Sequence, residues 1–463
     1  MKTIIEGKPT VEKLLGKQRP KDTLYRLMKY TLCEKCKEGA LLHNSITGRL
    51  VLLNDSEAEI LSKVPVSSSE VIHALIEHHY LVPLHYDEQA TVDTLRRMMR
   101  NLFTPKGING YTIMTTTNCN ARCFYCYQAN YRHITMTEET AEQLVCFMMQ
   151  HRGEDPLHIQ WFGGEPLVGI ARIDQISAKL KNNNLSFSSS MITNGFLFTE
   201  EIVERAVKLW ELRNVQITLD GTEDIYNKTK SFAVNCHSPY KRVLRNINLL
   251  LEHGIRVGIR LNLDQHNETD LYKLVEEIAN QIPNKKYLNV YAKVVYENEG
   301  YEPIVRTEEK QHELYETQFQ LNKTIFDAGL CRVFYSLPSL KHRSCMADNP
   351  RSVVVYPDGR LFNCEHTGEG DCFGNIESSE TDESISTKFS IPMNKIMCHD
   401  CPLYPSCLIL KACEGARTRN STTCSYEVRM KALAIMRQYE LSPSSEFQND
   451  DAEETENFFK GIS

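Results

Sequence analysis

The sequence contains no apolar run long enough to span a bilayer, and no positively charged leader followed by an apolar core and a small-residue cleavage site. It also lacks a basic excess, because 53 Lys and Arg against 60 Asp and Glu give a formal net charge of -7. A general nucleic-acid-binding protein needs a basic face, so this balance argues against that class. No solenoid-type repeat is present. We therefore expect a soluble, unexported protein with no nucleic-acid or membrane partner.

Cysteine, by contrast, is abundant, with 16 residues that fall mainly in tight clusters. Disulfide-dense scaffolds are short secreted chains, whereas this chain has 463 residues. Clustered thiols in a long, unexported chain favour metal ligation in a reducing compartment. The cytoplasm is the expected location.

The chain divides into five predicted parts, separated by changes in periodicity and composition. The fold class predicted is α/β, and its centre is a strand–helix alternation. The parts are a small α+β N-terminal domain with a linking helix (1–105), an alternating domain (106–300), a connecting helix (301–330), a cysteine-rich domain (331–428) and a C-terminal helix with a flexible acidic tail (429–463).

The second part reads as six β-α repeats. Right-handed crossovers between such repeats imply a parallel sheet, here a partial (β/α)6 relative of the eight-stranded TIM-type barrel. Ligands of such folds lie at the C-terminal ends of the strands. The strands are predicted at 111–117, 157–161, 189–193, 215–219, 256–263 and 288–294.

Three cysteines follow the first of these strands directly, in the spacing Cys119-x3-Cys123-x2-Cys126. Iron–sulfur clusters are held by thiolates, normally four of them. Three ligands in one loop leave one iron open, as a catalytic metal site requires. The alternatives are a zinc loop or buried structural thiols, but zinc usually takes paired Cys-x2-Cys halves. The triplet favours a [4Fe–4S] cluster with one open position.

Polar groups follow the other strands at the same mouth of the barrel. Adjacent glycines allow close approach of backbone to a ligand, and a carboxylate can accept a hydrogen bond from an ammonium group. Each motif alone has a structural reading, and their shared location is what points to a binding site. They are Gly163, Gly164 and Glu165 after the second strand, Asn194 after the third, Thr218 in Thr-Leu-Asp-Gly after the fourth, and Arg260 alternating with Asn262 on the fifth.

With these motifs, residues 111–295 resemble the radical S-adenosylmethionine (SAM) superfamily. The resemblance implies that Cys119, Cys123 and Cys126 bind the cluster and that SAM chelates the open iron. One-electron reduction would then cleave SAM to methionine and a 5′-deoxyadenosyl radical, which removes a hydrogen atom from substrate. It implies SAM contacts by Gly163, Gly164 and Glu165 (amine), the Tyr125 backbone (adenine), Thr218 (ribose), and Asn194, Lys230 and Arg260, with Lys230 where relatives have an arginine for the carboxylate.

The C-terminal cysteines resemble the twin-cluster extension called SPASM, which accompanies peptide-modifying radical enzymes. The alternative is a pair of zinc-ribbon knuckles. The resemblance implies two auxiliary [4Fe–4S] clusters, three clusters in all. One would be held by Cys398, Cys401, Cys407 and Cys424, and the other by Cys345, Cys364 and Cys413, with Cys331, Cys372 or an open site for substrate as the fourth ligand.

The N-terminal part has two further features: a predicted small domain and a pair of cysteines. Strands, a turn and two helices over residues 23–85 resemble the small peptide-recognition domain of peptide-maturing radical enzymes, which adds a leader peptide to a sheet edge. A structural cap on the barrel is the alternative. The pair Cys33-x2-Cys36 lies near a predicted strand end with no second pair nearby, so we interpret it as ordinary thiols rather than a metal site.

Together these features predict a maturase of a ribosomally made precursor peptide, which forms a thioether or another side-chain cross-link. Its partners would be the leader-bearing peptide and an electron donor such as flavodoxin or ferredoxin. An anaerobic sulfatase-maturing enzyme, which makes formylglycine, is the nearest alternative. A non-catalytic zinc or iron scaffold is the alternative from another class. No side chain stands out as the general base, and the catalytic residues therefore stay unknown.

Overall fold

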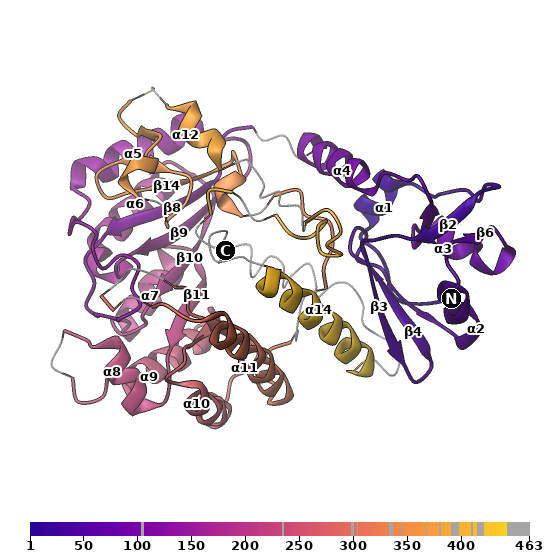
Figure 1. Cartoon of the computed structure of the whole chain (residues 1–463). Coiled ribbons are helices and arrows are strands. Elements are labelled where there is room, and N and C mark those ends of the chain that lie inside the picture. Colours follow the sequence, from indigo (N-terminus) through magenta and orange to yellow (C-terminus); the bar gives the residue numbers. More distant parts are fainter. Residues whose placement is uncertain are drawn as a thin grey trace. The chain divides into compact units, whose positions relative to one another are not determined.

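The computed structural model forms two compact units (Figure 1). Each is described here by itself. Unit 1 contains, among the residues that the structure describes, 1–102, 337–343, 398–408, 411–413 and 421–441; unit 2 contains 106–233, 236–297, 301–302, 304–332, 345–366, 368–378 and 381–389.

Unit 2 is built on a nine-stranded sheet with the order β13-β12-β11-β10-β9-β8-β14-β15-β16. The first six strands in this order are parallel, and β14 continues the parallel pairing beside β8. The strands are β8 (Gly110–Thr116), β9 (Leu157–Gly163), β10 (Phe187–Thr193), β11 (Leu212–Leu219), β12 (Arg256–Leu263), β13 (Leu288–Val294), β14 (Ser352–Val355), β15 (Arg360–Phe362) and β16 (Gly374–Asn375).

Helices cover the apolar face of this sheet. Alternate residues of the strands, such as Ile159, Ile217 and Ile259, are buried against α5, α6 and α9 in one continuous core. The helical elements of unit 2 are α5 (Glu138–His151), η2 (Pro166–Gly169), α6 (Ile170–Asn182), α7 (Glu200–Lys208), α8 (Glu223–Lys230), α9 (Pro239–Glu252), α10 (Glu268–Gln281), α11 (Glu308–Asp327), η3 (Met346–Asp348), η4 (Glu369–Asp371) and α12 (Glu383–Lys388).

The opposite face of the six barrel strands carries many polar residues, beside an apolar group that includes Met114, Phe162 and Ile192. The strand register places Gln160 beside Ser190, and Thr218 beside Arg260, which in turn lies beside Tyr291. These residues alternate with the apolar ones that face the helices, so they line the inside of the partial barrel. A polar interior is what a substrate or cofactor cavity needs, whereas a purely structural barrel would fill it with branched apolar side chains.

Unit 1 joins the N-terminal residues to the C-terminal cysteine segment and the last helix. A four-stranded sheet has the order β1-β5-β4-β3, and a three-stranded sheet has the order β6-β2-β7. The elements are β1 (Lys2–Ile5), α1 (Pro9–Leu15), β2 (Leu24–Leu27), β3 (Thr31–Cys36), β4 (Gly39–Asn44), β5 (Leu50–Leu53), α2 (Asp55–Leu61), β6 (Val66–Ser67), η1 (Glu70–Ile72), α3 (His73–Glu77), β7 (Leu81–Pro83), α4 (Glu88–Leu102) and α14 (Ser421–Leu441).

The inner strands β4 and β5 of the four-stranded sheet are buried on both faces. On β4, Leu42 packs with the helix α3 residues of one core, whereas Leu41 packs with Leu403 and Ile435 of the C-terminal segments. This follows from the two-residue period of a strand, which sends neighbouring side chains to opposite faces. With both faces of these inner strands covered, the edge strands β1 and β3 remain as the unpaired borders of the sheet within the described residues.

The predicted fold class is confirmed: the chain has a central parallel-sheet barrel, a small N-terminal α+β sheet domain and a cysteine-rich C-terminal part. The sequence missed β1, α1, β2 and the β14–β16 extension, because short strands carry too few residues for a periodic signal. The second of the two helices predicted within residues 23–85 is instead a 3-10 turn, η1, followed by the short α3. The five-part division stays a prediction, and the tail after residue 442 lies outside the described residues.

No helix within the described ranges is both long and apolar enough to cross a membrane.

A buried histidine makes the stability of unit 1 depend on pH. His43 on β4 is fully buried, its Nε2 lies 2.7 Å from the carbonyl oxygen of Pro338, and burial lowers its pKa to about 4. The unfolded chain binds a proton below about pH 6.5 that the folded chain does not, so stability falls as the pH drops from about 6.5 toward 4. At pH 5 we expect a loss of roughly 2 kcal/mol relative to pH 8.

Hydrogen exchange of the β4 and β5 amides, corrected for the intrinsic pH dependence, measures this loss. His43→Gln is the matched control, since an amide can still donate to the Pro338 carbonyl but does not titrate. Equal pH dependence in both proteins would refute the assignment.

Candidate active site

The cysteine loop begins where β8 ends, at the C-terminal edge of the barrel strands. Its backbone is tightly turned, because the Cys126 amide donates to the Cys123 carbonyl at 3.1 Å. The Ala121 amide also donates to the Cys119 sulfur at 3.4 Å, and Asn194 Nδ2 lies 4.0 Å from the same sulfur. The loop therefore turns its thiols inward and supplies them with hydrogen-bond donors.

The three thiols are near one another and withdrawn from water. Burial, with smaller contributions from the neighbouring Glu165, Cys123 and Cys126, raises the pKa of Cys119 to about 12. Burial likewise raises the pKa of Cys123 to about 11, although Lys230 opposes the shift. Thiolates crowded in this way require a compensating positive charge, which iron ions supply. The donor set therefore fits an iron–sulfur cluster bound by three cysteines.

The Gly163–Gly164 pair attaches the end of β9 to the start of the cysteine loop. The Gly164 amide donates to the Thr116 carbonyl at 3.0 Å, and the Glu165 amide donates to the Asn118 carbonyl at 2.9 Å. A Cβ on Gly164 would come within 2.4 Å of the Asn118 carbonyl oxygen, so no larger residue fits here. Close packing against the cysteine loop therefore requires a glycine at position 164, in addition to the SAM contact that the sequence predicts.

Glu165 is a fully buried carboxylate at this mouth. It accepts hydrogen bonds from Thr193 Oγ1 at 2.7 Å, from the Asn194 amide at 2.8 Å and from the Leu167 amide at 3.2 Å. Burial raises its pKa to about 7, and these hydrogen bonds hold the increase down. Asn194 also donates to Asn120 Oδ1 at 2.7 Å, which ties the third strand to the cysteine loop. An ammonium group arriving here would find a preorganised carboxylate acceptor.

The ammonium of Lys230, at the end of α8, contacts other side chains of the protein. Its Nζ lies 2.6 Å from Thr218 Oγ1, 2.8 Å from Tyr125 Oη and 3.0 Å from Asp220 Oδ2. Burial alone would lower the pKa of this ammonium, but Asp220 and Cys123 outweigh burial and raise it. Three acceptors use its three donors. The predicted role of Lys230 toward the carboxylate of SAM therefore stays a prediction, and the structure gives Lys230 a second role in the loop.

The same network fixes the cysteine loop to the fourth and fifth strands. Tyr125 Oη donates to Asp220 Oδ1 at 2.8 Å, and Asn262 Nδ2 donates to that oxygen at 3.0 Å. Asn267 Nδ2 in turn donates to the Asp220 carbonyl at 2.7 Å. The backbone adds a further link, because the Arg122 amide donates to the Lys230 carbonyl at 2.8 Å. The loop is thus held from the side of β11 and β12 as well as from β9.

Arg260 differs from Lys230 in having a buried side-chain donor without a hydrogen-bond partner among the described residues. Its Nε is buried in the barrel interior and has no hydrogen-bond partner among the described residues, and it interacts electrostatically with Tyr291. A buried guanidinium donor is costly to leave unsatisfied. The strand register puts Arg260 next to Thr218, one pleat below the Asp220–Asn262 layer. It is therefore the better-placed of the two predicted cations to receive a carboxylate inside the barrel.

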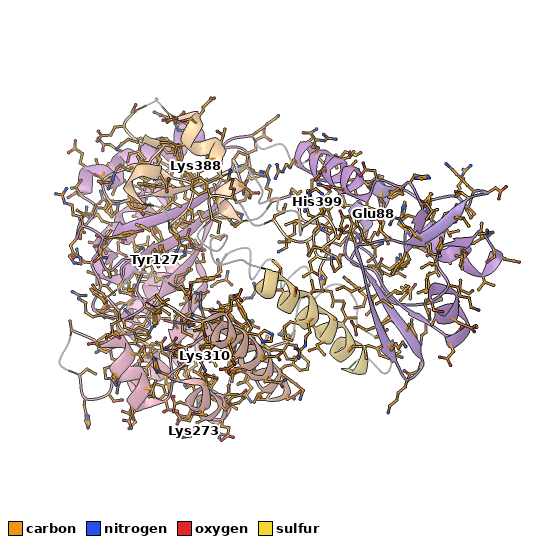
Figure 2. The ribbon with its side chains drawn as sticks, viewed as in Figure 1. Glu88, Tyr127, Lys273, Lys310, Lys388 and His399 are labelled. Carbon is orange, nitrogen blue, oxygen red and sulfur yellow. The ribbon has the colours of Figure 1, made fainter. Side chains whose placement is uncertain are left out.

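An aromatic contact links the cysteine loop to the segment that carries Cys364. Tyr127, which follows Cys126 and lies in unit 2 (Figure 2), has its ring 4.1 Å from the ring of His366. The His366 amide donates to the Cys364 sulfur at 3.4 Å. The sequence missed Tyr127 and His366, since neither belongs to a recognisable motif.

In unit 1, Cys401 lies within electrostatic reach of three other C-terminal cysteines. The pKa of Cys401 is raised to about 11 by burial, and the cysteines that add to the shift are Cys407, Cys424 and Cys398. These four thiols, from a loop and a helix, match in number the ligands of one fully ligated cluster. The second predicted set includes Cys345 and Cys364 of unit 2 and Cys413 of unit 1, and it stays a prediction.

The two candidates for a fourth ligand of that second set have different surroundings, both within unit 2. Cys331 packs against the barrel core, and burial alone raises its pKa to about 12. Cys372 lies in the small apolar cluster that also contains Met346, the residue after Cys345. Its sulfur contacts the Gly374 carbonyl at 3.2 Å. This placement favours Cys372 over Cys331.

Cys33 and Cys36 both lie on β3. Residues three apart on a strand point to opposite faces of the sheet, so the two thiols cannot chelate one ion together. Cys33 is exposed and Cys36 packs with the C-terminal segments. The geometry supports the interpretation of the pair as ordinary thiols.

The fold and site define an α/β barrel whose cysteine loop, after the first strand, is built for an iron–sulfur cluster. Residues 113–278 match the model of the radical SAM superfamily, and this part of the chain is a radical SAM domain. The domain implies a [4Fe–4S] cluster and SAM as cofactors, and the cysteine-rich C-terminal part fits a SPASM-like domain.

Two curated relatives and one solved structure are similar to this chain. The radical SAM cyclopropyl synthase TigE of Paramaledivibacter caminithermalis is 22% identical over 67% of this chain and 69% of its own length. A cysteine-type anaerobic sulfatase-maturating enzyme of Clostridium novyi is 27% identical over 35% of this chain and 46% of its own length. The crystal structure of Streptococcus suis SuiB has a TM-score of 0.50 at 16% identity and covers 83% of this chain and 94% of its own.

Proposed function

We propose that this chain is a radical SAM maturase of a ribosomally made precursor peptide, in which it forms a thioether or another side-chain cross-link. The observation that carries the proposal is that Cys401 lies within electrostatic reach of Cys398, Cys407 and Cys424, a second group of thiols besides the three-cysteine loop of the radical SAM domain. Support comes from TigE and from SuiB, for which a structure bound to precursor peptide SuiA is known.

The residues of the barrel mouth have separate roles in this proposal. Cys119, Cys123 and Cys126 hold the cluster, Glu165 accepts the ammonium of SAM, and Arg260 receives its carboxylate. Bound together, the cluster and SAM supply a 5′-deoxyadenosyl radical by one-electron cleavage of the sulfonium. The remaining predicted contacts, from Gly163, Gly164, the Tyr125 backbone, Asn194 and Thr218, surround this position on neighbouring strands and turns.

The proposal includes two auxiliary [4Fe–4S] clusters, three clusters in all. The first takes Cys398, Cys401, Cys407 and Cys424. The second takes Cys345, Cys364 and Cys413. Cys331 is the fourth ligand predicted from the sequence, with Cys372 and an open site for substrate as the alternatives, and the position of Cys372 beside Met346 supports the first of these alternatives.

The partners proposed are a leader-bearing peptide and a flavodoxin or ferredoxin as electron donor, in the cytoplasm. Because the inner strands β4 and β5 are buried on both faces, the leader would add to an edge of the four-stranded sheet. The edge strand β3 has exposed side chains at Cys33 and Lys35. Backbone pairing at such an edge needs little side-chain specificity.

The test uses the full chain, reconstituted anaerobically with iron and sulfide, then given dithionite, SAM and a short precursor peptide encoded beside its gene. We expect 5′-deoxyadenosine and a peptide lighter by about two hydrogen atoms. The mass difference follows from joining two side chains with loss of one hydrogen from each. An unchanged peptide mass despite 5′-deoxyadenosine would contradict cross-linking, and absence of 5′-deoxyadenosine would contradict the enzyme itself.

A sulfatase-maturing activity is the second candidate, favoured by the match to the Clostridium novyi enzyme. The two candidates differ in their need for a leader. The full chain is therefore offered the precursor, the same peptide without its leader, and a short Cys-x-Pro-x-Arg peptide. A leader-dependent maturase modifies the first much faster than the others, whereas a sulfatase maturase converts the third to formylglycine.

A further inference from the structure

The linking helix α4 carries a buried arginine that belongs to the C-terminal cysteine loop. Arg96 is 7% exposed, and its Nη2 lies 2.6 Å from the carbonyl oxygen of Tyr404, 3.3 Å from that of Pro405 and 3.4 Å from that of Cys407. Its Nε donates to the Lys341 carbonyl at 3.3 Å. One side chain of the N-terminal residues thus binds four backbone carbonyls of the C-terminal segments, all within unit 1.

Tyr404 completes this contact from the loop side. The Arg96 guanidinium lies 4.6 Å from the centre of the Tyr404 ring, which stacks on Tyr30 at 5.7 Å. Tyr404 Oη also donates to Asp93 Oδ1 at 3.0 Å, and Asp93 lies 3.5 Å from Arg96 Nη1. The tyrosine is therefore enclosed between two side chains of α4 and one from the loop before β3.

The bound carbonyls lie in the stretch between two of the converging cysteines. The Tyr404 amide donates to the Cys401 carbonyl at 2.9 Å, and the Cys407 amide donates to the Leu403 carbonyl at 2.9 Å. These bonds make the stretch a compact turn, and Arg96 holds its outward carbonyls. A displacement of Tyr404 would therefore be passed directly to Cys401 and Cys407.

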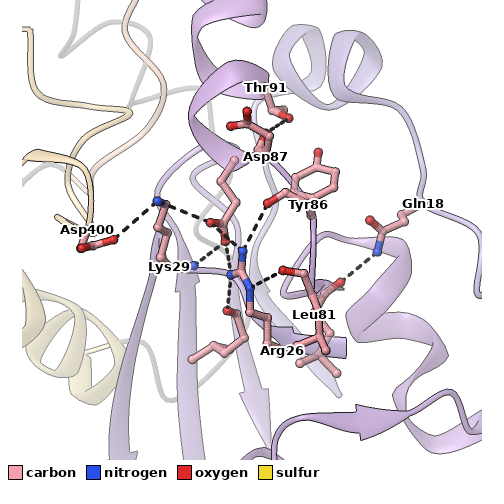
Figure 3. Close-up of polar contacts among 11 residues, drawn as sticks. Gln18, Arg26, Lys29, Leu81, Tyr86, Asp87, Thr91 and Asp400 are labelled. Carbon is pink, nitrogen blue, oxygen red and sulfur yellow. Dashed lines mark hydrogen bonds and ion pairs between the residues drawn. The ribbon is translucent and has the colours of Figure 1, made fainter. Parts of the chain in front are cut away.

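A weaker ion-pair chain reaches the same loop. Lys29 lies 3.5 Å from Asp400, which stands between Cys398 and Cys401 in the sequence (Figure 3). Lys29 also lies 3.8 Å from Glu88 at the start of α4, which pairs with Arg26. Asp400 is 90% exposed, so this link contributes little. The buried Arg96 contact is the one that can position the loop.

Charge and shape explain why an arginine is needed. Irregular loop carbonyls need hydrogen-bond donors, and a guanidinium offers five in a rigid plane, whereas an ammonium offers three from one point. A cation behind a thiolate-ligated cluster also stabilises its more negative, reduced state.

We propose that Arg96 is a positioning residue for the auxiliary cluster of Cys398, Cys401, Cys407 and Cys424, so that the N-terminal residues form part of the cluster's scaffold. The inference rests on the proposed function in assuming that these four thiols bind a cluster. It has a practical consequence: removing residues 1–95 would take away Tyr30 and Asp93 and would disturb the cluster as well as any leader contact.

The experiment uses the full chain in a background with Cys119, Cys123 and Cys126 changed to alanine, so that only auxiliary clusters remain. Arg96→Met and Arg96→Lys are compared with Arg97→Met and Arg97→Lys, since Arg97 is the exposed next residue of α4. After anaerobic reconstitution, iron per chain, the reduction potential and the electron paramagnetic resonance spectrum are measured.

Arg96→Met is expected to lose about four iron atoms per chain, the content of one cluster. Arg96→Lys keeps the charge and the buried stem, and is expected to keep iron but show an altered spectrum and potential. Both Arg97 variants should match the background protein.

Unchanged iron, spectrum and potential in both Arg96 variants would overturn the inference. Cys407→Ala separates this from failure of the proposed function. If Cys407→Ala also loses no iron, the four thiols bind no cluster, and the proposed function is what fails.

Discussion

Replacement of Cys123 by alanine is expected to reduce 5′-deoxyadenosine formation to the background level and to lower the iron content by about four atoms per chain. The thiol is buried beside Lys230 and within electrostatic reach of Cys126, so no exposed residue can take its place. Loss of one of three protein ligands leaves the cluster with two open positions, and a site with that few ligands does not retain it. The auxiliary clusters should remain.

The matched control is Cys146→Ala, because Cys146 is exposed on α5 and has no role in the site. It should keep the iron content and the rate of the parent protein. Formation of 5′-deoxyadenosine at the parental rate by the Cys123→Ala protein would show that the cysteine loop is not the catalytic centre.

The second large effect is expected at the buried ion pair of Lys230 and Asp220, whose side chains are 2% and 1% exposed. Lys230→Met leaves the Asp220 carboxylate buried without a cation, which costs roughly 3–5 kcal/mol of stability. In the double variant Lys230→Met with Asp220→Asn, neither charge remains and most of the loss should be recovered. The cysteine loop should become less ordered in the single variant, because Tyr125 of this loop is hydrogen-bonded to both Lys230 and Asp220.

The two tryptophans of the chain, Trp161 and Trp210, are fully buried in unit 2, so urea unfolding followed by tryptophan fluorescence reports on this unit. Lys273→Met is the control, since Lys273 is exposed on α10 (Figure 2) and should change stability by less than about 0.5 kcal/mol. A single variant as stable as this control would show that the pair does not hold the barrel mouth together.

Local patterns in the sequence were sufficient to predict the barrel strands and the cysteine loop. The six barrel strands were predicted within a few residues of their ends, because each is a continuous apolar-rich run between helices with a clear period. Asp220 and Asn262 stood in the quoted motifs, but their hydrogen bond joins two strands and has no local signature. The hydrogen bonds of Lys230 within the protein could not be predicted for the same reason, since its partners come from two other segments, the cysteine loop and the end of β11.

The sequence by itself determined that a three-thiol loop follows the first barrel strand, because spacing within a loop is a local property that survives in any fold. It also determined the polar residues at the strand ends, because parallel strands bring those ends to one edge. Only the tertiary structure decided that Arg96 holds the loop of Cys401 and Cys407 and that β14 extends the barrel sheet. Those pairings join segments hundreds of residues apart, and packing and hydrogen-bond satisfaction select them from many that the sequence allows.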